Sequence, residues 1–140
     1  MNVKNILDLI AAYSVNSEVI TLDNNTNMIK IEKYIDDNID KDISLEDIAN
    51  YLNMNPSYIS SLFSRHKNIT LFKFIQSRRV KKACHLLKIT DKSVRSVCEM
   101  VGYKDQNYFT RVFKEIMNTT PREYRKNYNY FDSKDSSLRI

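Results

Sequence analysis

The stretch VGYKDQNYFTRVFK, residues 101–114, decides the fold of this chain, because a related stretch, LNMNPSYISSLFS, stands at residues 52–64. In both, a turn residue (Asn53 or Gly102) precedes a helical pattern of a tyrosine, an apolar residue, two polar residues, another apolar residue and a phenylalanine. An internal repeat indicates that one supersecondary unit is used twice. Each copy has the order helix, tight turn, helix, which predicts a helix-turn-helix.

The similarity between the copies extends over residues 44–74 and 93–124. A long helix is expected between the two copies. Thr70 is its N-cap residue, and we expect the helix to end near Lys88. At 1.5 Å per residue this helix is about 25 Å long. Its predicted buried positions are Phe72, Ile75, Ala83, Leu86 and Leu87. The chain is therefore predicted to be all-α, with two helix-turn-helix subdomains joined by a long central helix.

Polar residues mark the expected helix starts. Ser44 is followed three residues later by Asp47, the pattern of a capping box. Asn55 precedes Pro56, a residue that suits the first helical position because its missing N–H has no partner there. The run Thr120-Pro121-Arg122-Glu123 combines both signals and predicts the start of a last helix.

Residues 27–131 contain both copies and are predicted to form one double helix-turn-helix domain. Residues 1–26 are interpreted as an N-terminal extension or linker of unclear function, with Val19–Leu22 as a short extended piece and Asp23–Asn27 as a polar turn. Residues 132–140 are predicted to be a polar tail. The first 13 residues carry an acidic residue and no small-residue cleavage pattern, so we expect no secretory signal.

Charge is distributed unevenly along the chain. Residues 1–42 hold four Lys against eight Asp and Glu, whereas residues 43–131 hold sixteen Lys and Arg against seven Asp and Glu. The positive excess therefore lies on the repeat, which favours a polyanionic partner over a generic basic surface. No apolar run approaches the roughly 20 residues that cross a membrane, so no membrane partner is expected.

The two cysteines and two histidines bear on compartment and chemistry. Cys84 and Cys98 lie in apolar helical patterns and are interpreted as buried free thiols, which suits a cytoplasmic location. The histidines have no clustered metal ligands beside them, and no nucleophile has an evident base. We therefore expect no metal, no cofactor and no enzymatic activity.

A helix-turn-helix buries one face of its second helix and leaves the other face free to enter a major groove. The two second helices are expected at about 56–66 and 106–116. Gln and Asn can contact adenine, Arg can contact guanine, and Ser and Thr hydroxyls can pair with donors or acceptors. The candidate base-contacting residues are Ser57, Ser60, Ser61, Gln106, Asn107, Thr110 and Arg111. The candidate phosphate-contacting residues, as cations or helix starts, are Ser44, Arg65, Lys67, Ser93 and Lys114.

Each of these residues also has an ordinary structural interpretation. Polar side chains on an outer helix face are often only solvated, and this alternative is strongest for the serines of the first copy. Arg78 and Arg79 are interpreted as structural ion-pair partners beside the long helix. Because the arginine and the amides lie in the second copy, we expect it to perform most of the direct base readout.

Residues 28 to about 127 resemble the DNA-binding domain of AraC/XylS-type transcriptional regulators. The resemblance is most specific in the quoted stretch 101–114 and in the Thr-Pro-x-x-Tyr-Arg sequence of residues 120–125. It implies seven helices, two recognition helices in adjacent major grooves, and transcription regulation, often activation through RNA polymerase. Asn68 and Asn118 replace glycines usual in the family, and Ser61 stands where an Arg is common, which weakens the expected readout by the first copy.

The leading prediction is a sequence-specific regulator of transcription that binds double-stranded DNA, acts as an activator, and is able to bind as a monomer. The alternative is a protein-interaction module that keeps the fold but binds a partner regulator or RNA polymerase. The serine-rich first copy and the acidic residues 1–42 support this alternative.

Overall fold

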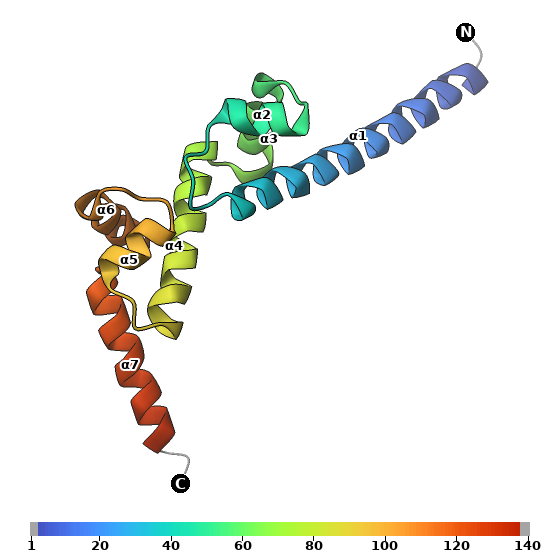
Figure 1. Cartoon of the computed structure of the whole chain (residues 1–140). Helices are drawn as coiled ribbons and strands as arrows, with labels where there is room; N and C mark the ends of the chain where they lie inside the picture. Colours follow the sequence, from blue (N-terminus) through green and yellow to red (C-terminus); the bar gives the residue numbers. More distant parts are fainter. Residues whose placement is uncertain (1–2, 138–140) are drawn as a thin grey trace.

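A computed structural model describes the backbone of residues 3–137 and the side chains of residues 5–11 and 22–129. Within this part the chain forms seven α-helices and no strands, as predicted (Figure 1). The helices are α1 (Val3–Asp37), α2 (Leu45–Leu52), α3 (Pro56–Lys67), α4 (Leu71–Ile89), α5 (Val94–Met100), α6 (Gln106–Met117) and α7 (Pro121–Ser137).

The described side chains form two separate apolar cores. The end of α1, helices α2 and α3, and the start of α4 together form what we call the first head. The end of α4, helices α5 and α6, and the start of α7 form the second head. The core of the first head contains Met28, Ile31, Ile35, Ile39, Ile48, Ala49, Ile59, Leu62, Phe63, Phe74 and Ile75. The core of the second head contains Val80, Ala83, Cys84, Leu86, Leu87, Val97, Cys98, Val101, Tyr103, Phe109, Val112 and Phe113.

Helix α4 is shared between the heads and lies at the centre of the molecule (Figure 1). Its first half contributes Phe74 and Ile75 to one core, and its second half, from Val80 onward, contributes to the other. The prediction of two helix-turn-helix units joined by a long helix is confirmed. Both cysteines are buried free thiols, and burial raises the pKa of each.

The helix ends follow the local sequence signals. The Ser44 side chain accepts a bond from the Asp47 backbone N–H while the Asp47 carboxylate accepts one from the Ser44 N–H, which completes the capping box. Thr120 and Glu123 make the same reciprocal pair at the start of α7. Asn53, Asn68 and Asn118 end their helices in the left-handed conformation, which asparagine tolerates better than most residues.

The interpretation of residues 19–27 was wrong. Neither an extended piece nor a turn occurs there, because α1 is continuous from Val3 to Asp37. The polar residues expected to break it are accommodated within the helix: the Thr26 hydroxyl donates to the Leu22 carbonyl at 3.0 Å, and Asn24 and Asn27 both bond the Tyr58 hydroxyl of α3. The N-terminal part of α1 projects away from the first head (Figure 1).

One further expectation also needs correction. Phe72 is not a core residue, since 63% of it is exposed. The inward positions of α4 near its start are Phe74 and Ile75, and Phe72 lies about 200° round the helix from Phe74. Helix α7 also extends into the predicted polar tail, as far as Ser137, through a segment without Gly or Pro.

Candidate nucleic-acid interface

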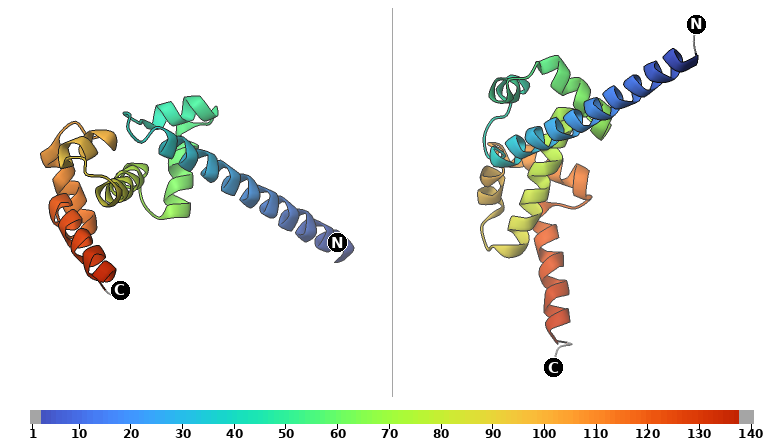
Figure 2. Two further views of the ribbon diagram at one scale, coloured as in Figure 1. Left: turned by 60° about the horizontal axis from the view of Figure 1, so that its bottom comes forward. Right: turned by 90° about the vertical axis from the view of Figure 1, so that its right-hand side faces the viewer.

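Helices α3 and α6 lie on the same side of α4, and α2 and α5 lie on the other (Figure 2, right panel). Each of α3 and α6 follows a shorter helix across a tight turn and is anchored by large apolar residues from one face. In α3 these are Ile59, Leu62 and Phe63, and in α6 they are Phe109 and Phe113, all fully buried. The opposite faces of the two helices are therefore free and point to a common side of the molecule.

The free face of α3 presents three serine side chains. Ser57, Ser60 and Ser61 are all exposed, as predicted for residues that could contact bases. At the start of α3, where Pro56 has no N–H, the N–H of Ser57 is bonded to the Asn55 side chain at 2.8 Å. A face of short hydroxyl side chains can approach DNA closely but offers few bonds that distinguish one base from another.

The free face of α6 is richer in functional groups. Gln106, Asn107 and Arg111 are exposed, and Thr110 is half-buried. The Arg111 guanidinium lies over the ring of Tyr108, 5.7 Å from its centroid. Because stacking on an aromatic ring restricts the rotamers of an arginine, this contact favours one position of the Arg111 guanidinium.

The two serines at the starts of α2 and α5 have different surroundings. The Ser44 hydroxyl donates to Asp47 and lowers the pKa of that carboxyl, so the first turn of α2 carries a negative charge. A second carboxylate, Glu46, lies in the same turn. The first turn of α5, after Ser93, carries no acidic residue. Electrostatics therefore favours a phosphate beside Ser93 over one beside Ser44.

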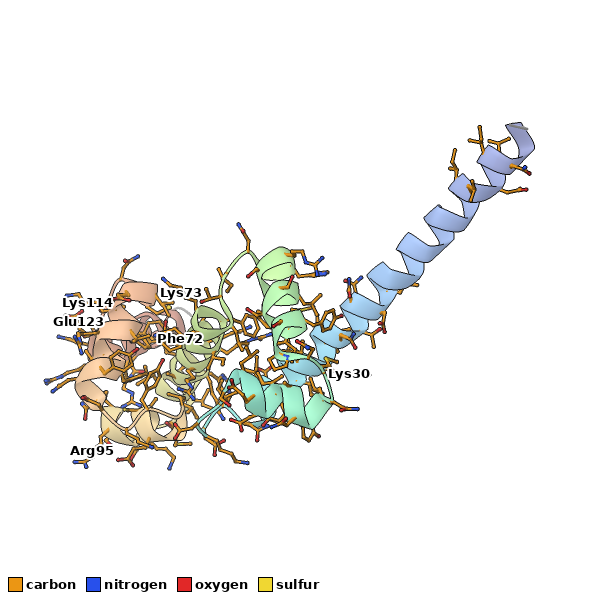
Figure 3. The ribbon with its side chains drawn as sticks, turned by 90° about the horizontal axis from the view of Figure 1, so that it is seen from above. Lys30, Phe72, Lys73, Arg95, Lys114 and Glu123 are labelled. Carbon is orange, nitrogen blue, oxygen red and sulfur yellow. The ribbon has the colours of Figure 1, made fainter. Side chains whose placement is uncertain are left out.

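The three candidate cations also differ. Lys67 forms an ion pair with Glu32 of α1, which pairs in turn with Arg78 of α4. Arg65 and Lys114 are exposed on α3 and α6, and Figure 3 shows Lys114 on the outer side of the second head. Some of the acidic residues before Ser44 thus neutralise structural cations and leave Arg65 and Lys114 as the better phosphate candidates.

Comparison with known proteins identifies the architecture. A family model described as "Helix-turn-helix domain" matches residues 48–127. The TetD protein of transposon Tn10 from Escherichia coli is 34% identical over 94 residues, which cover 67% of this chain and 68% of TetD. The chain belongs to the AraC/XylS family.

Other members of the AraC/XylS family are longer. Regulatory protein PocR of Salmonella typhimurium is 32% identical over 102 residues, which are 73% of this chain but 34% of PocR. The chain thus spans about a third of the length of that relative. The C-terminal domain of AraT, a response regulator from Geobacillus stearothermophilus, matches with 30% identity and a TM-score of 0.69, covering 72% of this chain and 84% of that domain. The relatives carry helix-turn-helix DNA-binding domains, which are non-enzymatic.

The sequence did not predict which residues of this AraC/XylS-type chain lie between the two candidate recognition helices, α3 and α6. Figure 3 shows Phe72 and Lys73, at the start of α4, in the space between α3 and α6. A groove of about 540 Å³ lies beside Phe72, between the loop before α2 at Ile43 and the residues Tyr108 and Arg111 of α6. Helical phase gives no clear signal for Phe72, because it stands three positions before the buried Ile75 but only two before the buried Phe74.

Two observations on the described residues complete the site. No group of three or more His, Cys, Asp or Glu side chains among them is arranged to hold a metal ion. None of the helices in the described part combines the length and the apolar character that crossing a bilayer requires.

Proposed function

We propose that this chain binds double-stranded DNA sequence-specifically, with α3 and α6 in adjacent turns of the major groove, and that it activates transcription from such sites. The observation that supports this best is the common orientation of α3 and α6, each with a polar exposed face on the same side of α4 (Figure 2). A single chain then supplies both reading helices and can bind as a monomer.

The dimensions of α4 support two contacts on one face of DNA. Its 19 residues correspond to about 28 Å at 1.5 Å per residue. Successive major-groove turns on one face of DNA are about 34–36 Å apart. Since the heads pack on the two halves of α4 and add their own width, this spacing is within reach of α3 and α6.

We propose a division of labour between the helices. Gln106, Asn107, Thr110 and Arg111 of α6 perform most of the base readout, while Ser57, Ser60 and Ser61 of α3 contribute fewer base contacts. Arg65, Lys114 and the start of α5 at Ser93 contact phosphates, with Lys67 and Ser44 as weaker candidates. We place the chain in the cytoplasm, a proposal supported by its two buried free thiols.

The second candidate function is a protein-interaction module that binds RNA polymerase or a partner regulator. The observation that favours it is the apolar surface near the start of α1, where Ile6, Leu7 and Leu9 are 43%, 61% and 64% exposed. An activator needs a contact with the transcription machinery as well as with DNA, so the two functions are compatible. They differ in whether DNA is bound directly.

The test is selection of bound sequences from a random double-stranded library, followed by a mobility-shift titration of the selected sites at several salt concentrations. Direct recognition predicts an enriched sequence and an affinity that falls steeply between about 50 and 200 mM salt, because binding releases cations from the phosphates and this release is less favourable at higher salt. Failure to enrich any sequence, or weak binding indifferent to salt, would leave the interaction module as the better account.

A further inference from the structure

The two heads meet beside the middle of α4, where one arginine contacts both of them. Arg79 donates from Nε to the Ile39 carbonyl at 3.2 Å and from a terminal nitrogen to the Lys41 carbonyl at 2.7 Å. Both carbonyls belong to the first head and the loop that follows α1. The same guanidinium lies over the ring of Tyr103 in the second head, 5.3 Å from its centroid.

The turn of the second head approaches the first head closely at Gly102. This residue has φ +90°, and a Cβ added to it would lie 2.5 Å from the Ile39 carbonyl oxygen and 3.1 Å from Nε and Cζ of Arg79. Real Cβ atoms essentially never come so near a backbone oxygen. The glycine therefore serves the turn and also lets the two heads come together at the Ile39 carbonyl.

The middle of the central helix contains a feature that can allow bending between the heads. The Ser77 hydroxyl donates back to the Phe74 carbonyl at 2.7 Å, in the middle of α4 and between its two core-facing halves. Back-bonding of this kind is associated with helix bending. The ion pair between the heads, Lys104 with Asp42, joins side chains that are 87% and 83% exposed, where solvent screens the attraction.

We infer that Arg79, Gly102 and Tyr103 form a clasp against the carbonyls of Ile39 and Lys41 that sets the distance and angle between the heads. On the proposed function, this clasp determines how many base pairs separate the two major-groove contacts. Arg79 is then a positioning residue for DNA recognition, although it lies away from the free faces of α3 and α6. The groove bordered by Phe72 and Arg111 is the space whose width the clasp controls.

The first experiment measures the distance between the two heads in the absence of DNA. Spin labels on cysteines introduced by Asn50→Cys in α2 and Glu115→Cys in α6, both exposed positions, report the distance between the heads. Cys84 and Cys98 are buried and should label slowly in the folded chain. We expect one narrow distance distribution for the parent chain and a clearly broader one after Arg79→Met.

Arg78→Met is the matched control. It removes the same charge from the adjacent position of α4, but Arg78 pairs with Glu32 and Asp36, so its ion-pair contacts lie within the first head. The distribution should stay narrow in this variant. Arg79→Lys, which keeps the charge and can reach only one carbonyl, should give an intermediate width and serves if Arg79→Met does not fold. Equal widths for the parent, Arg78 and folded Arg79 variants would overturn the clasp.

The second experiment measures affinity for selected sites in which one base pair is inserted or deleted between the two contacts. One base pair changes the spacing by about 3.4 Å and the rotation by about 35°. We expect the affinity of the parent chain and of Arg78→Met to fall about tenfold or more with each insertion or deletion. Arg79→Met should bind the best site more weakly than the parent chain, and its affinities for the different spacings should differ by less than about threefold.

The two experiments separate failure of the clasp from failure of the proposed function. A broadened distance distribution in a protein that binds no DNA would support the clasp and refute the DNA-binding proposal. An unchanged spacing profile in a folded Arg79→Met chain that binds DNA well would refute the clasp alone.

Discussion

Arg111 is the residue on which base readout should depend most, because it is exposed, cationic and held over Tyr108 on the free face of α6. Arg111→Ala should weaken binding to the selected site by about 1–3 kcal/mol and relax the preference at one base position. A mobility-shift assay against single-base variants of the site measures both effects.

Lys30→Ala is the control for this variant. Lys30 is an exposed cation on α1, far from α6 in Figure 3, and its removal changes the net charge equally. It should leave the base preference intact. If Arg111→Ala weakens binding uniformly on all sequences, Arg111 is a phosphate contact instead of a base reader.

Tyr103 should make the stability of the chain sensitive to alkaline pH. The residue is 6% exposed, its hydroxyl has no hydrogen-bond partner among the described groups that meets good geometry, and burial raises its pKa to about 12 although the Arg79 charge opposes this. A pKa raised in the folded state contributes stability that is complete below about pH 10 and is lost as pH rises to about 12.

Tyr103→Phe removes this titration and keeps the ring. Between pH 10 and 12 its free energy of unfolding should fall less than that of the parent chain, by up to about 2–3 kcal/mol for a shift of about two pK units. Urea unfolding across this pH range measures the difference. Parallel pH profiles for the two proteins would show that the hydroxyl is not buried as described.

At the scale of single helices, the sequence predicted what local chemistry determines. The caps at Ser44, Thr70 and Thr120 depend on residues within three positions, and the structure confirms them. The continuity of α1 through Asn24 and Asn27 could not be predicted in this way. Those side chains are satisfied by Tyr58, more than thirty positions away, and no pattern within α1 shows that.

Asn118 gives a test at this scale. It ends α6 at φ 57°, where an L-residue with a Cβ is disfavoured and the relatives' usual residue, by the resemblance, is glycine. Asn118→Ala should lower the free energy of unfolding by about 1–2 kcal/mol, whereas Asn118→Gly should leave it equal or higher. Thermal or urea unfolding distinguishes them. Equal stability of the alanine and glycine variants would contradict the assigned backbone conformation.

At the scale of the whole molecule, the domain is proposed to begin near residue 22, a few residues before the predicted boundary at residue 27. Asn24 bonds the first head through Tyr58, whereas Ile6, Leu7 and Leu9 are exposed. Deleting residues 1–21 should change the free energy of unfolding by less than about 0.5 kcal/mol, as for other surface changes. A larger loss in urea unfolding would mean that the start of α1 packs on the domain.

The candidate interface was predictable in composition but not in arrangement. The repeat and the positions of Gln106, Asn107 and Arg111 predicted which side chains are free, because they follow from the phase of one helix. The sequence did not predict Phe72 between the heads or the role of Arg79, which was expected only to form ion pairs. Arg79 instead bonds main-chain carbonyls about forty positions away, and main-chain acceptors have no sequence signature.

The central claim is that one chain reads two successive major grooves with α3 and α6. Methylation interference at guanine N7 on the selected site tests it most directly, because N7 lies in the major groove. The account predicts two clusters of interfering guanines on one face of the DNA, centred about 10 base pairs apart. A single cluster, or binding unaffected by methylation anywhere in the site, would contradict it.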